Sequence, residues 1–207
     1  MKKRLWDLYA PVYERAMRSD RAVYEYMYER IAAAVAGREV LELATGPGLI
    51  AKHVAGVTKR MVATDYSEGM LREAKKGTFP PQLRFEIADA MALPYGDDSF
   101  DAVVIANALH LLPSPETALA EIDRVLRPGG LLIAPNFVEH ENSAAGRLWN
   151  SVLKAAGVHF EHQWTAQAYL AFLESGGWRV VFSHETAGRI PLLYAECVRA
   201  REESEGR

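Results

Sequence analysis

The sequence contains very little cysteine and no long hydrophobic run. Its 207 residues include a single cysteine, Cys197, so no disulfide can form within the chain, and a reducing compartment is expected. No window approaches the ~18 consecutive apolar residues that a membrane-spanning helix requires. The basic start, Met1-Lys2-Lys3-Arg4, is not followed by the apolar stretch of a signal peptide. We therefore expect a cytoplasmic protein without a membrane span.

An excess of positive charge is also missing. The chain carries 24 Lys and Arg against 27 Asp and Glu, for a net charge of −3, so no broad basic surface for nucleic acid is expected. Histidines and cysteine show no metal-ligand spacing, and His159 and His162 are expected to be loop or pocket-wall residues. We predict no metal site. A hydrophobic content of 49% is enough for one α/β domain with a sizeable core.

Apolar segments alternate with turn residues in an order typical of an α/β protein. Val23, Met27, Ile31 and Val35 recur every fourth residue and predict a helix over 19–36. Ser67, Ser114 and Thr165 are expected helix N-caps. We expect strands at 40–43, 61–65, 83–87, 100–106, 131–134, 178–183 and 192–198, and further helices at about 48–55, 67–77, 114–127 and 165–176.

The last two expected strands are joined by a short connection. Only about eight residues separate 178–183 from 192–198, whereas a parallel crossover needs roughly a dozen or more. The pair is therefore predicted to form an antiparallel hairpin that closes an otherwise parallel sheet. An ordinary dinucleotide-binding domain is not expected to end in this way.

A glycine turn follows the first expected strand, and an acid ends the second. The turn contains Gly46 and Gly48 and opens a helix, an arrangement that brings backbone N–H groups close to a polar ligand. Asp65 ends the second strand, where its carboxylate can accept both hydroxyls of a ribose. Together these features predict a nucleoside-binding site. The turn also fits the weak dinucleotide pattern G-x-G-x-x-A through Ala51, which by itself leaves NAD open.

Four segments in order carry a resemblance to a known family. They read VLELATGPG at 40–48, ATDYS at 63–67, DAMALPY with DSFD at 89–101, and RVLRPGG at 124–130. At this spacing they resemble the class I S-adenosylmethionine-dependent methyltransferases, and in particular the ubiquinone/menaquinone-biosynthesis methyltransferase group. The resemblance implies a doubly wound, Rossmann-like α/β fold with a seven-stranded, mostly parallel sheet and an antiparallel last strand. It also implies S-adenosyl-L-methionine as the cofactor.

The resemblance assigns residues to the two ends of that cofactor. It places Glu42, Ala44, Thr45, Gly46, Gly48, Ala106 and Asn107 beside the methionine portion. It places Asp65 on the ribose and Tyr66, Met70, Asp89, Ala90 and Met91 around the adenine. Ala44 stands where the family usually has a glycine, which preserves a small side chain but disfavours a positive φ.

Segments on both sides of the cofactor-binding core are expected to form the acceptor site. The resemblance implies a single methyltransferase domain with an N-terminal helical lid (1–36), a cofactor-binding core (37–135), a substrate-side segment (136–177) and a terminal β-hairpin (178–198). Tyr9 and Tyr13 are candidate lid residues, with simple packing against the sheet edge as the alternative. The 136–170 segment mixes five aromatic residues with polar ones, Phe172 lies just beyond it, and the region predicts a small-molecule acceptor that is partly apolar.

The sequence leaves open the role of His110 and two alternative functions. His110 follows the fourth strand and is a weak candidate for a general base, because nothing in the sequence supplies a partner to orient it. Methyl transfer needs no dedicated base unless the nucleophile carries a proton that must leave early. The alternatives are a non-catalytic module that binds S-adenosylmethionine and a nicotinamide-dependent oxidoreductase. The sequence carries no signal for the oligomeric state.

Overall fold

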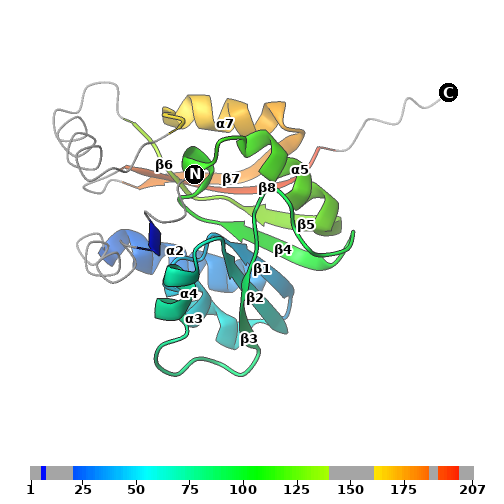
Figure 1. The fold of residues 1–207 in the computed structure, drawn as a ribbon. Coiled ribbons are helices and arrows are strands. Elements are labelled where there is room, and N and C mark those ends of the chain that lie inside the picture. Colours follow the sequence, from blue (N-terminus) through cyan, green and yellow to red (C-terminus); the bar gives the residue numbers. More distant parts are fainter. Residues whose placement is uncertain (1–5, 8–20, 140–160, 187–190, 201–207) are drawn as a thin grey trace.

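One mixed β-sheet runs through the molecule, and helices cover both of its faces (Figure 1). The computed structural model describes residues 6–7, 21–139, 161–186 and 191–200. In this part of the chain the sheet is eight-stranded, with the order β3-β2-β1-β4-β5-β8-β6, and β7 pairs with β8. The strands are β1 (Glu39–Leu43), β2 (Arg60–Asp65), β3 (Leu83–Ile87), β4 (Phe100–Ile105), β5 (Leu126–Ile133), β6 (Asn136–Phe137), β7 (Trp178–Thr186) and β8 (Leu192–Arg199).

The helices begin and end close to the expected residues. They are α2 (Arg21–Val35), α3 (Leu49–Val54), α4 (Glu68–Ala74), α5 (Pro115–Val125) and α7 (Ala166–Ser175), with short 3-10 turns η2 (Ala55–Val57) and η3 (Leu109–Leu111). Two predicted caps are confirmed, since Ser67 and Thr165 accept the backbone N–H groups of Met70 and Ala168. Ser114 also stands at the predicted N-cap position of α5, but its hydroxyl pairs with that of Thr117 and not with a backbone N–H group.

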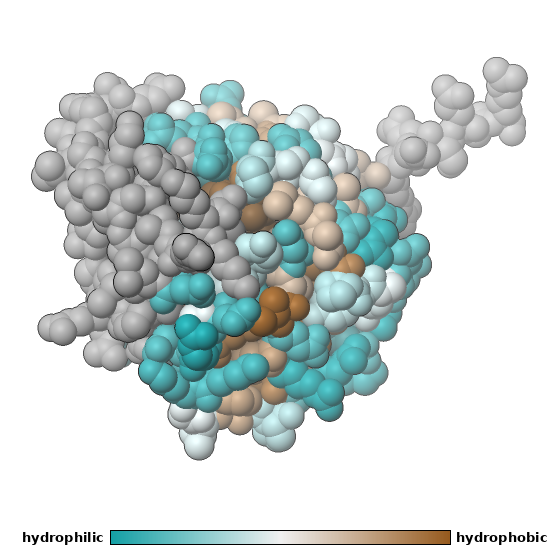
Figure 2. All heavy atoms as spheres, in the orientation of Figure 1, coloured by the Kyte–Doolittle hydropathy of each residue, from teal (hydrophilic) through white to brown (hydrophobic). Residues whose placement is uncertain are grey.

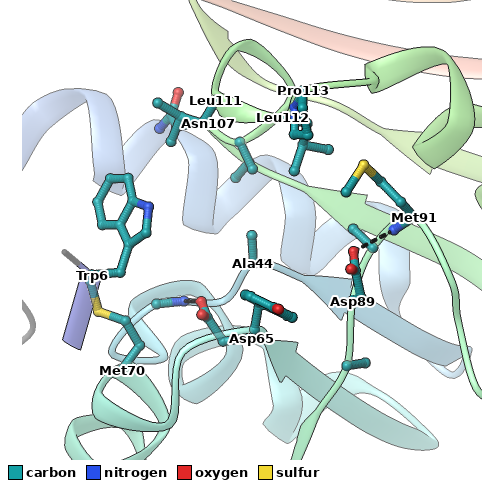
Figure 3. A pocket seen from close by; sticks show the side chains of 16 residues that line it. Trp6, Ala44, Asp65, Met70, Asp89, Met91, Asn107, Leu111, Leu112 and Pro113 are labelled. Carbon is teal, nitrogen blue, oxygen red and sulfur yellow. Dashed lines mark hydrogen bonds between the residues drawn. The ribbon is translucent and has the colours of Figure 1, made fainter. Parts of the chain in front are cut away.

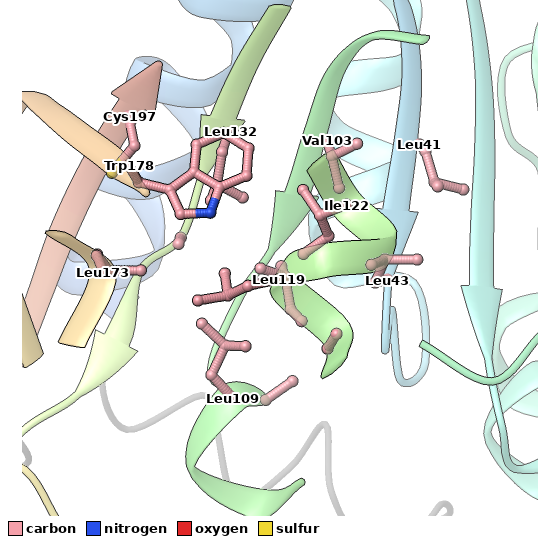
Figure 4. Packing of buried hydrophobic residues seen from close by; sticks show 14 of the residues in the cluster. Leu41, Leu43, Val103, Leu109, Leu119, Ile122, Leu132, Leu173, Trp178 and Cys197 are labelled. Carbon is pink, nitrogen blue, oxygen red and sulfur yellow. The ribbon is translucent and has the colours of Figure 1, made fainter. Parts of the chain in front are cut away.

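Two hydrophobic layers hold the sheet between the helices. Because side chains alternate along a strand, neighbouring residues of β4 enter opposite layers. Val103 packs in the layer beneath α5 and α7, which Figure 4 shows together with Ile122, Leu173 and Trp178. Val104 packs in the opposite layer with residues of α2, α3 and α4. The predicted stripe of α2 is confirmed, because all four of its apolar residues are buried in this second layer.

The predicted hairpin is confirmed. β7 and β8 pair antiparallel along most of their length, and β8 also pairs antiparallel with β5, whereas β1, β2, β3, β4 and β5 pair parallel. The two-residue strand β6, which follows β5 along the edge of β8 opposite β7, was not expected. β5 also begins earlier than predicted, because Leu126 pairs with Phe100 before an irregularity restores the register at Ala102 and Leu131.

Candidate functional site

A pocket opens where the parallel strands β1, β2 and β4 end at their carboxyl side (Figure 3). This edge is where open α/β sheets bind ligands. Figure 3 shows Trp6 and Met70 at one side of the pocket and Asp89 and Met91 at the other, with Ala44 and Asp65 between them. The lining consists of Trp6, Ala44, Gly46, Asp65, Tyr66, Met70, Ala88, Asp89, Ala90, Met91, Ala106, Asn107, Ala108, Leu111, Leu112 and Pro113.

The turn after β1 has a left-handed backbone at three positions. Ala44, Gly46 and Gly48 have φ angles of 53°, 56° and 78°. A Cβ on Gly46 would meet no atom within 4 Å, whereas one on Gly48 would lie 3.0 Å from the Phe85 ring. Gly48 therefore permits close packing of the turn on β3, and Gly46 leaves room at the pocket. Ala44 adopts the positive φ that its side chain disfavours, at a cost on the order of 1 kcal/mol.

Asp65 at the end of β2 ties this turn to the next loop. Its Oδ2 accepts the backbone N–H of Gly46 and its Oδ1 accepts that of Ser67, both at 2.8 Å. Each carboxylate oxygen retains a further lone pair for a ligand hydroxyl. Burial raises the pKa of Asp65 from its ordinary value, and the two backbone donors oppose that rise.

Glu42 is a buried acid on β1. Its side chain is only 2% exposed, and its Oε2 has no hydrogen-bond partner among the residues that the structure describes. The pKa of Glu42 is raised to about 8, mainly by burial and also by the nearby charge of Asp65, against the lowering effect of Thr45 and the Ala51 backbone. Glu42 does not line the pocket itself; it lies on β1, two residues before the lining residue Ala44.

Asn107 supplies a second buried acceptor just beyond β4. Its backbone has a φ of 52°, and its N–H donates to the Pro135 carbonyl at 2.8 Å. The Asn107 side chain lines the pocket, yet within the described residues its Oδ1 accepts no hydrogen bond. A buried acceptor without a donor is costly, so a polar ligand that donates here would be stabilised.

The loop after β3 forms the opposite wall. Asp89 accepts the Met91 backbone N–H on Oδ1 at 2.9 Å, which fixes the carboxylate beside Ala90 and Met91. On the α4 side, Met70 is buried at 3% exposure while Tyr66 is 41% exposed. The pocket is therefore bounded by two sulfur-bearing side chains and by two carboxylates from different loops. Figure 2 shows hydrophobic atoms gathered near the middle of this face among hydrophilic ones.

The structure brings together most of the residues that the sequence singled out. Ten of them share the pocket lining: Ala44, Gly46, Asp65, Tyr66, Met70, Asp89, Ala90, Met91, Ala106 and Asn107. Glu42, Thr45 and Gly48 belong to β1 and the turn that follows it, but they do not line the pocket. Tyr9 and Tyr13 lie outside the described residues. The sequence reasoning did not identify Trp6 or the η3 wall of Leu111, Leu112 and Pro113 as pocket residues. The aromatic composition of 5–14 was the one signal that pointed toward Trp6.

His110 lies in η3 but does not line the pocket. It is 4% exposed, and its Nδ1 lies 2.8 Å from Asn136 Oδ1, a partner that the sequence did not reveal. Since the Asn136 amide nitrogen donates to the Phe137 carbonyl, its oxygen faces the ring, which makes Nδ1 the donor. Burial lowers the pKa of His110 to about 4, so the ring is neutral near pH 7.

Neither a metal centre nor a membrane-spanning helix is found in the described part of the chain. Among residues 6–7, 21–139, 161–186 and 191–200, no group of three or more His, Cys, Asp or Glu could hold a metal ion. In the same ranges, no helix has the length and apolar character to cross a membrane.

Comparison with known proteins identifies relatives of the whole fold. A family model described as a methyltransferase domain matches residues 41–134. The demethylmenaquinone methyltransferase of Beutenbergia cavernae is 32% identical over 190 residues, which cover 83% of this chain and 78% of that protein. The DhpI–SAH complex superimposes with a TM-score of 0.74 at 22% identity, covering 97% of this chain and 96% of that chain, and shows the likeness of the fold.

Other relatives match over a shorter region. The demethylmenaquinone methyltransferase of Renibacterium salmoninarum is 42% identical over 104 residues, or 50% of this chain and 43% of that protein. The match therefore spans less than half the length of that relative.

Proposed function

This chain belongs to the class I S-adenosylmethionine-dependent methyltransferases, and from that premise we propose that it transfers a methyl group to a small, partly apolar acceptor by in-line displacement. The observation that carries the proposal is the pairing of Asp65 with the Gly46 backbone at the carboxyl edge of the sheet. It holds a carboxylate and a glycine turn in one pocket, as a nucleoside ligand requires.

The buried polar atoms of the site fit an S-adenosylmethionine molecule. Glu42 Oε2 and Asn107 Oδ1 are acceptors without a donor among the described residues, and they lie on the adjacent strand ends β1 and β4. We assign them to the amino-acid ammonium of the cofactor, Glu42 directly or through water. The remaining lone pairs of Asp65 suit the ribose hydroxyls. Asp89 and Met91 suit the adenine amino group and ring.

The cofactor supplies a methyl group that is already activated by a positively charged sulfur. The protein then has two tasks, which are to align the acceptor with that methyl group and to exclude water. Alignment alone can contribute about 7–11 kcal/mol in favourable cases. His110 is buried in η3 and does not line the pocket, and its role as a general base stays a prediction for acceptors that must lose a proton.

The η3 side of the pocket supports an apolar acceptor. Leu111, Leu112 and Pro113 stand there with Trp6, and none of the four carries a charge. Relatives over most of this chain are named demethylmenaquinone methyltransferases, so reduced quinones belong in the first panel of acceptors to be tested. Cytoplasmic location and the lack of a nucleic-acid partner stay predictions, which cell fractionation and binding assays can test.

A transfer assay with methyl-labelled S-adenosylmethionine tests the proposal. The protein is incubated with reduced quinones, other small aromatic acceptors, RNA and a mixture of proteins. Label in a small molecule supports the proposal, whereas label only in RNA or protein refutes it. Thermal shift provides the second arm: stabilisation by S-adenosylmethionine is expected, and stabilisation by NADH alone would favour an oxidoreductase. Tight cofactor binding without turnover of any acceptor would indicate a binding module.

A further inference from the structure

Asp7 makes a close polar contact with the start of helix α4. Its Oδ1 accepts the hydroxyl of Ser67 at 2.6 Å and the backbone N–H of Gly69 at 2.8 Å. Sixty residues or more separate Asp7 from these two donors in the sequence. Hydrogen bonds that involve a charged group are stronger than neutral ones. The contact therefore fixes the Trp6–Asp7 dipeptide against the cofactor-binding core.

Gly69 makes this approach possible. A Cβ on Gly69 would lie 2.6 Å from Asp7 Cα and 2.8 Å from Asp7 Oδ1, distances that real Cβ atoms do not show. Gly69 stands in the first turn of α4, and no positive φ requires a glycine there. Glycine is a poorer helix former than alanine, so the local backbone alone would favour alanine. The space that Asp7 occupies is the physical reason for glycine at this position.

The same contact leads directly to the pocket. Ser67, whose hydroxyl donates to Asp7, also donates its backbone N–H to Asp65 Oδ1 at 2.8 Å. Its hydroxyl oxygen accepts the N–H of Met70, a lining residue. Trp6, the neighbour of Asp7, stands in the lining next to Met70 (Figure 3). One serine thus holds both Asp65 and the residue that fixes Trp6.

We propose that Asp7 is a positioning residue for cofactor binding, which holds Trp6 in the pocket wall by docking on Ser67 and Gly69. The inference rests on the proposed function, because the ligand of the pocket is taken to be S-adenosylmethionine or its product. Asp7 itself does not line the pocket. It acts through Trp6 on one side and through the Ser67–Asp65 contact on the other.

Gly69→Ala is the sharpest test, since it removes the docking space without removing a polar group. We expect the variant to bind S-adenosylhomocysteine about tenfold more weakly, mainly through faster dissociation, because loss of the charge-assisted contacts releases Trp6. The melting temperature of the ligand-free variant should fall little, since alanine favours the helix. Gly56→Ala is the matched control, because a Cβ there would approach only Pro80, at 4.0 Å.

A double-mutant cycle separates docking from a general structural effect. Asp7→Ala should weaken binding by a similar factor, and Asp7→Ala with Gly69→Ala should be little worse than either change alone. Fluorescence quenching is compared between the wild type and Gly69→Ala, each with and without Trp6→Phe. The part of the signal that Trp6→Phe removes reports whether Trp6 becomes more accessible in Gly69→Ala. Unchanged binding in Gly69→Ala would overturn the docking role, and so would fully additive losses of binding free energy in the double variant. In either case, binding by the wild type would still support the proposed function. A wild-type protein that does not bind would overturn both.

Discussion

Replacing Glu42 with glutamine tests whether the buried Glu42 carboxyl is protonated in the ligand-free protein. Glu42 is 2% exposed, and its Oε2 has no partner in the described part of the chain. Burial raises the pKa of this carboxyl to about 8, with the charge of Asp65 adding to the rise. Glutamine keeps the shape of the side chain and cannot ionise. The variant should therefore fold as the wild type does in the absence of ligand.

The direction of the pH effect follows from the raised pKa. Below a pH of about 4.5 the carboxyl is protonated in both the folded and the unfolded chain, so its stabilising contribution is fully present. As the pH rises toward about 8, the unfolded chain loses this proton first. The wild type then loses about 1.4 kcal/mol of stability per pH unit from this group, and at most about 5 kcal/mol over the whole window.

Urea unfolding of both proteins without ligand at about pH 5.5, 6.5 and 7.5 measures this difference. The free energy of unfolding of Glu42→Gln minus that of the wild type should increase by about 1.4 kcal/mol with each pH unit. Glu29→Gln, at an exposed position of α2, is the matched control for the exchange of carboxyl for amide. A difference that stays constant across the three conditions would refute the neutral, buried carboxyl.

Two further predictions concern the glycine turn after β1 and the ion pair between Arg30 and Glu196. Gly48→Ala should lower the free energy of unfolding by about 2–3 kcal/mol, because it adds left-handed strain and a Cβ 3.0 Å from the Phe85 ring. Gly46→Ala should lower the free energy of unfolding by only about 1 kcal/mol but should weaken binding of S-adenosylmethionine. Equal losses of stability in Gly48→Ala and Gly46→Ala, measured by thermal unfolding, would contradict this difference. Glu196→Gln should cost about 1–2 kcal/mol by weakening its 2.6 Å contact with the partly exposed Arg30, and unchanged stability would contradict that role.

The sequence predicts the parts of the fold that depend on local signals. The short connection before Leu192 predicted the antiparallel hairpin, because chain length alone forbids a parallel crossover there. Ser67 and Thr165 capped helices as their side-chain chemistry predicts. The two-residue strand β6 was not predicted, since a strand that short has no periodicity of its own.

The parts that were not predicted depend on contacts between distant residues. Trp6 enters the pocket because Asp7 docks on a helix start far along the chain, and no local pattern carries that information. Ala44 takes a positive φ against its own preference. The Thr45 N–H donates to the Thr64 carbonyl at 2.8 Å, and this tertiary contact holds the turn. The glycine turn and the acid after β2 were recognisable because their spacing reflects parallel neighbouring strands.

Calorimetric titration of S-adenosylmethionine into the wild type and Asp65→Ala measures whether Asp65 binds the cofactor. We expect the wild type to bind and the variant to bind at least about 100-fold more weakly, because two charge-assisted hydrogen bonds of roughly 1.5–3 kcal/mol each are lost. Asp97→Ala, at a carboxylate 73% exposed and outside the pocket lining, should bind as the wild type does. Equal affinity in the wild type and Asp65→Ala would show that Asp65 does not hold the ribose and would refute the proposed cofactor site.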